Sequence, residues 1–392
     1  MEGRGPDSAI SPLRITAGAS AVMALNGLVG ASWGAVLVPA AAHFRLGLVL
    51  TGSIFAVRGA SSMAGALAAG TLSERLPRHW LLAAYGVVLV AGLLVVALAP
   101  SWWVVLGGTA AISAAFAGTG TEAASLVSIA VGARRGRYLN ITNAIYGLGA
   151  AAGPLLVGVL VSSGSSWRWA FVLWAALAAA VVPAFGQLAG RLPGAASTRR
   201  RPASLRGAWG RQALVLWAIA FTYNGVAWTI VGWSATWFVQ RFGTGLLLGA
   251  SSATVFYLFL TVGRLGNAAA ESRFAPRSLL AVEAVATGAG LIAAALAHSP
   301  LPAMVAFAFT GLAMGGLYPN AQAEAIALVP ERPGALAASV GVAGAVGTMT
   351  VPALTGLLPD SAAAMGSLPL WAVVMPVLGV LGWILGRARA VR

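Results

Sequence analysis

Charged residues stand inside long apolar stretches of this chain, where such groups are rare. Glu122 lies in the stretch 102–131, Arg58 in 47–70 and Arg264 in 246–269. A charge at the centre of a bilayer costs about 3 kcal/mol or more, so such a group usually faces a partner or a water-filled cavity. A carboxyl group that alternates between water and a closed cavity can bind and release a proton. We therefore predict proton coupling at Glu122, with a static hydrogen-bonded tie between helices as the alternative.

Amide, phenol and indole side chains also lie within the apolar stretches. Amides and phenols exchange hydrogen bonds with hydroxyl groups, and indoles stack on the apolar face of a sugar ring, so a few of them in apolar walls suit a small polar ligand. The candidate substrate-binding residues are Asn26, Trp33, Arg58, Asn143, Tyr146, Asn224, Trp228, Tyr318, Asn320 and Gln322. For Arg58 an ion pair with Glu122 and contact with an anionic substrate are both open. Tryptophans also favour the membrane interface, which is our prediction for Trp102, Trp103, Trp167, Trp169 and Trp237.

A second set of charged residues lies toward one end of the apolar stretches. Glu283 and Glu324 are within reach of Arg273, Arg277 or Arg332 in the sequence. Salt bridges at such places hold one conformation and break in another. We therefore assign a gate or scaffold role to Glu74, Arg75, Arg78, Arg264, Arg273, Arg277, Glu283 and Glu324.

The elements that must position these residues are membrane-spanning helices. The chain is 59% hydrophobic and 8% charged, whereas soluble domains carry about 25% charged residues. A spanning helix needs about 20 mostly apolar residues. Twelve stretches qualify: 15–41, 47–70, 79–99, 102–131, 138–162, 167–189, 212–239, 246–269, 278–297, 301–328, 334–358 and 367–387. The sequence predicts an all-α membrane protein.

The chain repeats itself after 198 residues without a gap. Asn26 falls on Asn224, Phe44 on Phe242, Arg75 on Arg273 and Pro154 on Pro352. Two same-direction copies of a hydrophobic unit are typical of transporters built from two pseudo-symmetric six-helix bundles. We expect a cytoplasmic tail over 1–14, one bundle over 15–190, a cytoplasmic linker over 191–211, the second bundle over 212–387 and a cytoplasmic tail over 388–392. In this register Glu122 falls on Asn320 and Arg58 on Phe256, so charge breaks the symmetry there.

The net charge of +15 is distributed by location. Nearly all arginines fall in alternate connections between the stretches, with Arg45, Arg168 and Arg241 among the exceptions. This asymmetry is the positive-inside pattern, and it predicts a multi-pass protein of the cell inner membrane with both termini in the cytoplasm. We therefore interpret the basic charge as a topology signal and expect no nucleic-acid partner.

The sequence lacks the motifs that several kinds of chemistry require. The chain has neither a phosphate-binding Gly-x-x-x-x-Gly-Lys-Ser/Thr loop nor a cysteine, and its His and carboxylate residues have no metal-ligand spacing. No nucleophile–base arrangement stands out. We expect neither an enzyme, a catalytic residue, a metal nor a cofactor. The expected partners are a small-molecule substrate, a proton and the lipid bilayer, and we expect a monomer.

Two connecting segments carry a family resemblance. One runs from Gly70 through Glu74 and Arg75 to Arg78, and the other from Gly263-Arg264 through Glu271 to Arg277. Both resemble the loop signature of the major facilitator superfamily, whose arginines pair with acids on opposite helices. The resemblance implies secondary transport by alternating access.

A narrower similarity is to the fucose/glucose–proton symporter family. It rests on Glu122-Ala-Ala, Ser272 to Pro276, Tyr318-Pro319 and Val351-Pro352. It implies proton-coupled symport of a sugar-like solute through Glu122, although Ala35 and Leu126 depart from the family's pattern. The alternatives are proton-driven export of drug-like or amphipathic molecules, and organic-anion transport using Arg58 and Arg264. A transporter-like sensor or an intramembrane enzyme has no supporting motif.

Overall fold

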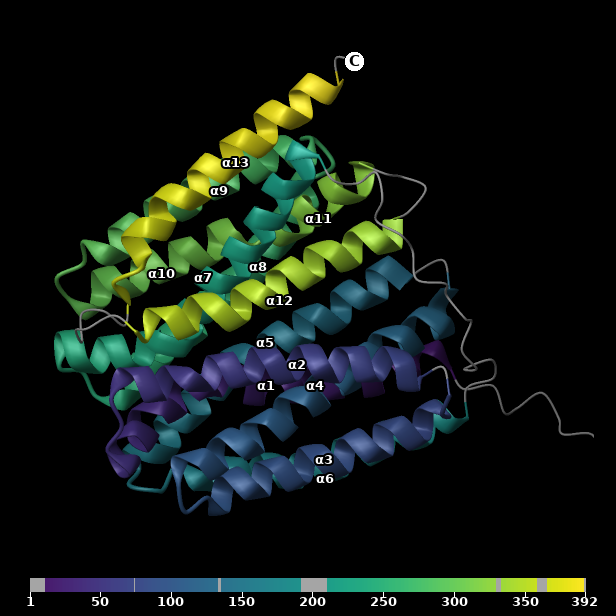
Figure 1. The fold of residues 1–392 in the computed structure, drawn as a ribbon, viewed down its shortest axis with the longest axis vertical. Helices are drawn as coiled ribbons and strands as arrows, with labels where there is room; N and C mark the ends of the chain where they lie inside the picture. The colour runs from purple at the N-terminus through teal and green to yellow at the C-terminus, as the bar shows by residue number, and fades with distance from the viewer. Residues whose placement is uncertain are drawn as a thin grey trace, which may run out of the picture. The chain divides into compact units, whose positions relative to one another are not determined.

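A computed structural model describes residues 11–73, 75–132, 135–191, 210–328, 333–357 and 365–390, and their long elements are all α-helices (Figure 1). Glu74, Arg332 and most of the predicted tails and linker lie outside these ranges. The helices are α1 (Pro12–Phe44), α2 (Leu48–Leu72), α3 (Arg78–Leu98), α4 (Trp102–Val131), α5 (Arg135–Ser162), α6 (Arg168–Gly190), α7 (Arg211–Phe242), α8 (Leu246–Ala270), α9 (Pro276–Ala295), α10 (Pro300–Met314), α11 (Leu317–Leu328), α12 (Pro333–Thr355) and α13 (Leu368–Ala390).

Eleven helices within the described residues are long and apolar enough to cross a membrane. They correspond to eleven of the twelve predicted stretches, with α10 and α11 together forming the span Pro300–Leu328. The remaining stretch corresponds to α12, whose shorter apolar part is Ser339–Thr355. The prediction of an all-α, multi-pass membrane protein is thus confirmed.

The helix boundaries repeat with the sequence. α1 ends at Phe44 and α7 at Phe242, while α2 begins at Leu48 and α8 at Leu246, so 242 − 44 and 246 − 48 both give 198. One pair differs. α4 is continuous through Ala117 and Gly118, whereas the equivalent positions Gly315 and Gly316 separate α10 from α11.

By contacts, the chain divides into two compact units. The first unit comprises Met1–Gly30, Ala60–Gly153 and Ser165–Arg200. Within it α3 packs against α4 and α6, and α3 and α6 lie side by side in Figure 1. Its core gathers apolar side chains from four helices: Ile15, Ala19, Val22, Leu82, Ala123, Leu126, Val127, Val131, Phe185 and Ala189.

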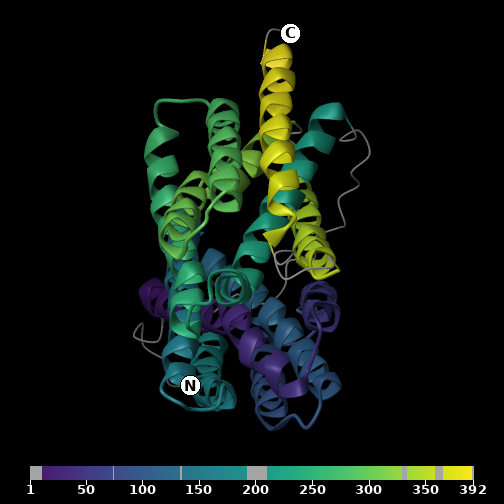
Figure 2. The same cartoon turned by 90° about the vertical axis from the view of Figure 1, so that its left-hand side faces the viewer.

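The second unit comprises Ala31–Gly59, Pro154–Gly164 and Arg201–Arg392. Within it α7 packs against α8 and α12, and α13 packs against α9 (Figure 2, α13 in yellow). The unit therefore includes the end of α1 and the start of α2. The predicted bundle boundaries at 190 and 212 stay a prediction.

Small residues bring α1 and α2 close to the helices of the second unit. A Cβ on Gly34 would overlap the carbonyl oxygen of Val231, and a Cβ on Gly52 would lie 3.3 Å from the Cα of Gly356. The ring of Phe55 fills the space over Gly232. Such glycine contacts determine helix packing in lipid, where the hydrophobic effect is absent.

The five tryptophans that we predicted at the membrane interface differ in exposure. Trp103 is 70% exposed and Trp169 is also exposed, as a lipid-facing residue would be, but Trp102, Trp167 and Trp237 are buried. Neighbours on a helix point about 100° apart, since a turn holds 3.6 residues. One tryptophan of an adjacent pair can therefore face outward while the other packs in the core.

Candidate functional site

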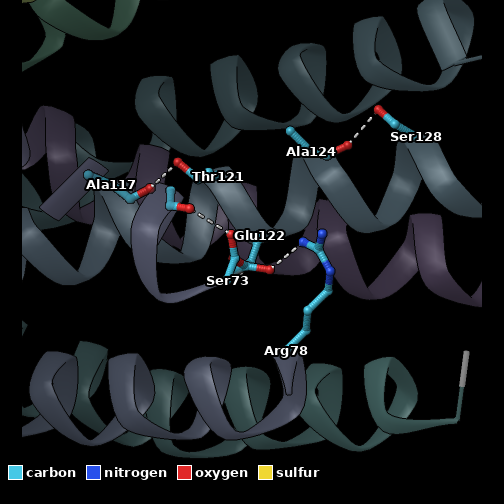
Figure 3. Close-up of polar contacts among 8 residues, drawn as sticks. Ser73, Arg78, Ala117, Thr121, Glu122, Ala124 and Ser128 are labelled. Atoms are coloured by element: carbon cyan, nitrogen blue, oxygen red, sulfur yellow. Dashed lines mark hydrogen bonds and ion pairs between the residues drawn. The ribbon is translucent and has the colours of Figure 1, made fainter. Parts of the chain in front are cut away.

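The first polar centre is an ion pair in the first unit. Arg78 is the first residue of α3, and its Nη1 donates to Glu122 Oε2 on α4 at 2.7 Å. Figure 3 shows the guanidinium extending from α3 to the carboxylate. The two side chains are 10% and 0% exposed, so this charge-assisted bond is shielded from water. The structure thereby joins the predicted coupling residue to a predicted scaffold arginine.

Glu122 retains a second acceptor. Its Oε1 is buried and has no hydrogen-bond partner among the residues that the structure describes. Removing one member of a buried ion pair costs about 3–5 kcal/mol because it leaves an uncompensated charge. Loss of the Arg78 contact would therefore leave a proton as the simplest means to neutralise Glu122.

Asn26 on α1 is the next polar group of the first unit. Its Nδ2 donates to Thr119 Oγ1 at 3.3 Å and to the Phe116 carbonyl at 3.4 Å, both on α4. Its Oδ1 is buried without a partner in the described part of the chain. The two candidates on α5 differ: Tyr146 is half-buried, and Asn143 is exposed. Asn26 is therefore the candidate of this unit whose acceptor is buried and unsatisfied within the described residues.

In the second unit, Arg58 lies between two indoles. Its guanidinium carbon is 5.9 Å from the ring centre of Trp33 on α1 and 4.9 Å from that of Trp228 on α7. At these distances a guanidinium is attracted to the aromatic face. Three predicted substrate-binding residues thus meet.

A further cation lies among phenols. Arg264 on α8 donates from Nη2 to the hydroxyl of Tyr223 at 3.4 Å, and the rings of Tyr223 and Tyr318 are 5.6 Å apart. Asn224, beside Tyr223 in the sequence, donates within its own helix to the Ala220 carbonyl. Arg264, which we assigned to the scaffold, therefore shares a polar cluster with the substrate candidate Tyr318.

The last cluster is centred on Asn320, which is fully buried. Its Nδ2 donates to Asn267 Oδ1 and to Glu283 Oε2, each at 2.9 Å. Asn267 Nδ2 in turn donates to Glu271 Oε1 at 2.7 Å. Sequence reasoning missed Asn267. Its repeat partner is Ala69 (267 − 198 = 69), so a comparison of the repeats for amides as well as charges would have found it.

The remaining predicted residues lie toward the predicted cytoplasmic ends of the helices. Arg277 and Glu324 both flank Gly386 of α13, and their gate or scaffold role stays a prediction. Arg75 and Arg273 are exposed, and Gln322 is half-buried. Glu74 lies outside the described residues.

The fold and its candidate spans define a polytopic all-α membrane protein. Residues 19–300 match the Major Facilitator Superfamily, and the chain belongs to this family. Two curated relatives, uncharacterized MFS-type transporters from two strains of Mycobacterium tuberculosis, are 30% identical over 200 residues. The match covers 49% of this chain and 26% of each relative, so it spans about a quarter of their length.

Solved structures share the fold over nearly the whole chain. A bacterial homologue of the human lysosomal transporter Spinster, inward-facing and unoccupied, has a TM-score of 0.77 at 15% identity, with 98% of each chain covered. A peptide transporter has a TM-score of 0.78 at 13% identity, covering 97% of this chain and 99% of that one. A nucleoside transporter has a TM-score of 0.75 at 12% identity, covering 96% and 99%. The predicted major facilitator fold is confirmed, and the fucose/glucose–proton symporter family stays a prediction.

Proposed function

We propose that the protein is a secondary active transporter that moves a small polar, sugar-like solute across the inner membrane by proton-coupled symport. The observation that carries this proposal is the ion pair of Glu122 with Arg78. Arg78 follows the α2–α3 connection. A movement of that connection would withdraw the guanidinium, and a proton would then replace it on Glu122.

We attribute this movement of the α2–α3 connection to alternating access. In the second unit, the end of α1 and the start of α2 rest against α7 and α12 through Gly34 and Gly52. The arginine distribution places these segments at the outer side of the membrane and both termini in the cytoplasm. Opening toward the outside requires these glycine contacts to separate.

A polar solute suits the uncharged groups. Asn26 has an acceptor without a partner among the described residues, and Trp33 and Trp228 present indole rings. The neighbours with this fold include a peptide and a nucleoside transporter, so a panel of polar solutes is the appropriate screen. We expect a monomer, because each pair of bundles encloses its own site in this fold class.

Uptake by proteoliposomes tests the proposal. Radiolabelled monosaccharides, nucleosides, dipeptides and organic anions are offered with the external buffer acidic, and then without a pH gradient. Symport predicts that at least one neutral solute accumulates only with the gradient. Accumulation that is independent of the gradient, or expulsion of preloaded hydrophobic cations alone, would contradict it, the second result favouring export.

Organic-anion transport is the second candidate, because Arg264 contacts Tyr223 beside Tyr318 and Arg58 lies on two indoles. Guanidinium and phenol groups together bind carboxylates well. Under this alternative, Arg58→Ala raises the Kd of an anionic solute at least about tenfold, or about 1.4 kcal/mol, while binding of neutral solutes is unchanged. An equal rise in Kd for anionic and neutral solutes would mean that Arg58 serves packing and not anion binding.

A further inference from the structure

The cluster around Asn320 contains a carboxyl group for which the proposed function has no use. Glu283 on α9 is half-buried. Its Oε2 accepts from Asn320, and the backbone N–H of Gly316 also donates to its carboxylate. None of these partners is a cation. Glu122, by contrast, meets a guanidinium.

The repeat shows that this cluster is specific to the second unit. The equivalents of Asn267, Glu283 and Asn320 are Ala69, Tyr85 and Glu122, each 198 residues earlier. In the first unit the tyrosine ring lies against Gly118, and in the second unit the Glu283 carboxylate lies against the equivalent Gly316. The first unit therefore has the phenol of Tyr85, neutral at ordinary pH, where the second unit has the carboxyl group of Glu283.

The helical hydrogen bonding also changes at this place, while the backbone torsions of Gly315 stay α-helical. α10 ends at Met314 and α11 begins at Leu317, so the two-residue break lies against Glu283 and Asn267. A Cβ at residue 316 would overlap both side chains. Interrupted helices in transporters place backbone polar groups at ion and substrate sites.

We propose that Glu283 is a second, reversible proton-binding site, formed with Asn320 at the break between α10 and α11. The ligand is a proton taken from water. It binds the carboxylate of Glu283, and its release restores the arrangement in the structure. This inference deepens the proposed proton coupling and rests on it for a role in transport, although proton binding itself needs no substrate.

Both protonation states find hydrogen-bond partners among the same residues. The carboxylate accepts from Asn320 Nδ2 and Gly316. Asn320 Oδ1 is buried without a partner in the described residues. The oxygen and nitrogen of an amide occupy nearly interchangeable positions, so a turned Asn320 offers Oδ1 to Glu283. The amide of Asn267 must turn with it, because Asn320 Oδ1 would otherwise face the acceptor Asn267 Oδ1. Only a protonated carboxyl group can donate to the turned Asn320 Oδ1.

In the described part of the chain, no cation on the surrounding helices neutralises the Glu283 carboxylate. Glu271, at the end of α8, adds a second negative charge through Asn267. Arg264 of α8 contacts Tyr223, and Arg387 of α13 stacks on Trp383. Arg277 and Glu324 flank Gly386. An uncompensated charge among apolar groups is costly, and proton uptake removes it.

Infrared difference spectroscopy of the purified full chain during a pH titration tests this inference. The probe is the proton alone, followed by the C=O stretch of a protonated carboxyl group. We expect a titrating band that is present in the wild type, in Glu122→Gln and in Glu324→Gln, and absent from Glu283→Gln. Glu283→Asp should keep a titrating band at a changed frequency, and so guards against a variant that merely misfolds.

An unchanged band in Glu283→Gln would overturn the inference, as would the absence of any band assignable to Glu283. The test separates this failure from that of the proposed function. If the band is lost in Glu283→Gln but the wild type shows no gradient-driven uptake, proton binding stands and symport falls. If uptake is proton-driven but the band persists in Glu283→Gln, only this inference falls.

Discussion

At the scale of single residues, two carboxyl groups in this chain differ in what compensates them. Glu122 is buried against the guanidinium of Arg78, and Glu283 accepts from an amide and a backbone N–H. A guanidinium keeps its proton under all ordinary conditions. Proton uptake by Glu122 therefore costs an ion pair, whereas Glu283 can exchange a proton without breaking one.

Removing Arg78 should expose the dependence of Glu122 on its partner. We expect Arg78→Ala to lower the free energy of unfolding by about 3–5 kcal/mol, followed as Tm in detergent. The loss should be larger at high pH than at low pH, because a proton can replace the missing cation. Adding Glu122→Gln should recover part of it.

The matched control is Arg75→Ala, since Arg75 is exposed in the same connection. An exposed substitution changes stability by at most about 0.5 kcal/mol. Equal effects of the two alanine variants, or no recovery with Glu122→Gln, would show that the Arg78–Glu122 pair contributes little.

At the scale of elements, the break between α10 and α11 shows how a helix accommodates a polar cluster. Gly315 packs on the backbone of Gly263 and Arg264, and Gly316 packs on Glu283 and Asn267. Side chains larger than hydrogen do not fit at either position. The two glycines between α10 and α11 are therefore needed to make room for the hydrogen-bond cluster.

Gly316→Ala should destabilise the protein by about 1–3 kcal/mol through overpacking, and should remove the infrared signal of Glu283. Gly266→Ala is the control, because a Cβ at residue 266 of α8 meets nothing within 4 Å. It should be neutral or stabilising by up to about 1 kcal/mol. Thermal unfolding of both variants in one detergent gives the comparison, and similar Tm values would contradict it.

The contact of α2 with α12 offers a test of alternating access. The wild-type chain has no cysteine, so Gly52→Cys with Gly356→Cys can be cross-linked on a clean background. The Cβ of either residue lies within 3.4 Å of the other's Cα. We expect the cross-link to abolish uptake and reduction to restore it, with each single cysteine variant as control. Full uptake by the cross-linked protein would mean that these helices need not separate.

At the scale of the whole molecule, the sequence could predict the all-α fold because it depends on apolar length and on the 198-residue repeat. Neither the apolar length nor the repeat depends on how individual side chains pack. The candidate site was less predictable. Glu122 was identifiable as a charge in a span, but its pairing with Arg78 depends on how α3 and α4 pack. Asn267 and Glu283 are linked through Asn320, which requires α8, α9 and α11 to pack together. The spacing of these residues in the sequence does not predict that packing.

The central claim, proton-coupled transport, is tested most directly by comparing accumulation with exchange for Glu122→Gln in proteoliposomes. The probe is the neutral solute that the uptake panel identifies, and the wild-type protein is the control. The account predicts that Glu122→Gln loses gradient-driven accumulation but still exchanges internal for external solute at a rate near the wild type's. A Glu122→Gln variant that still concentrates the solute against its gradient would contradict it.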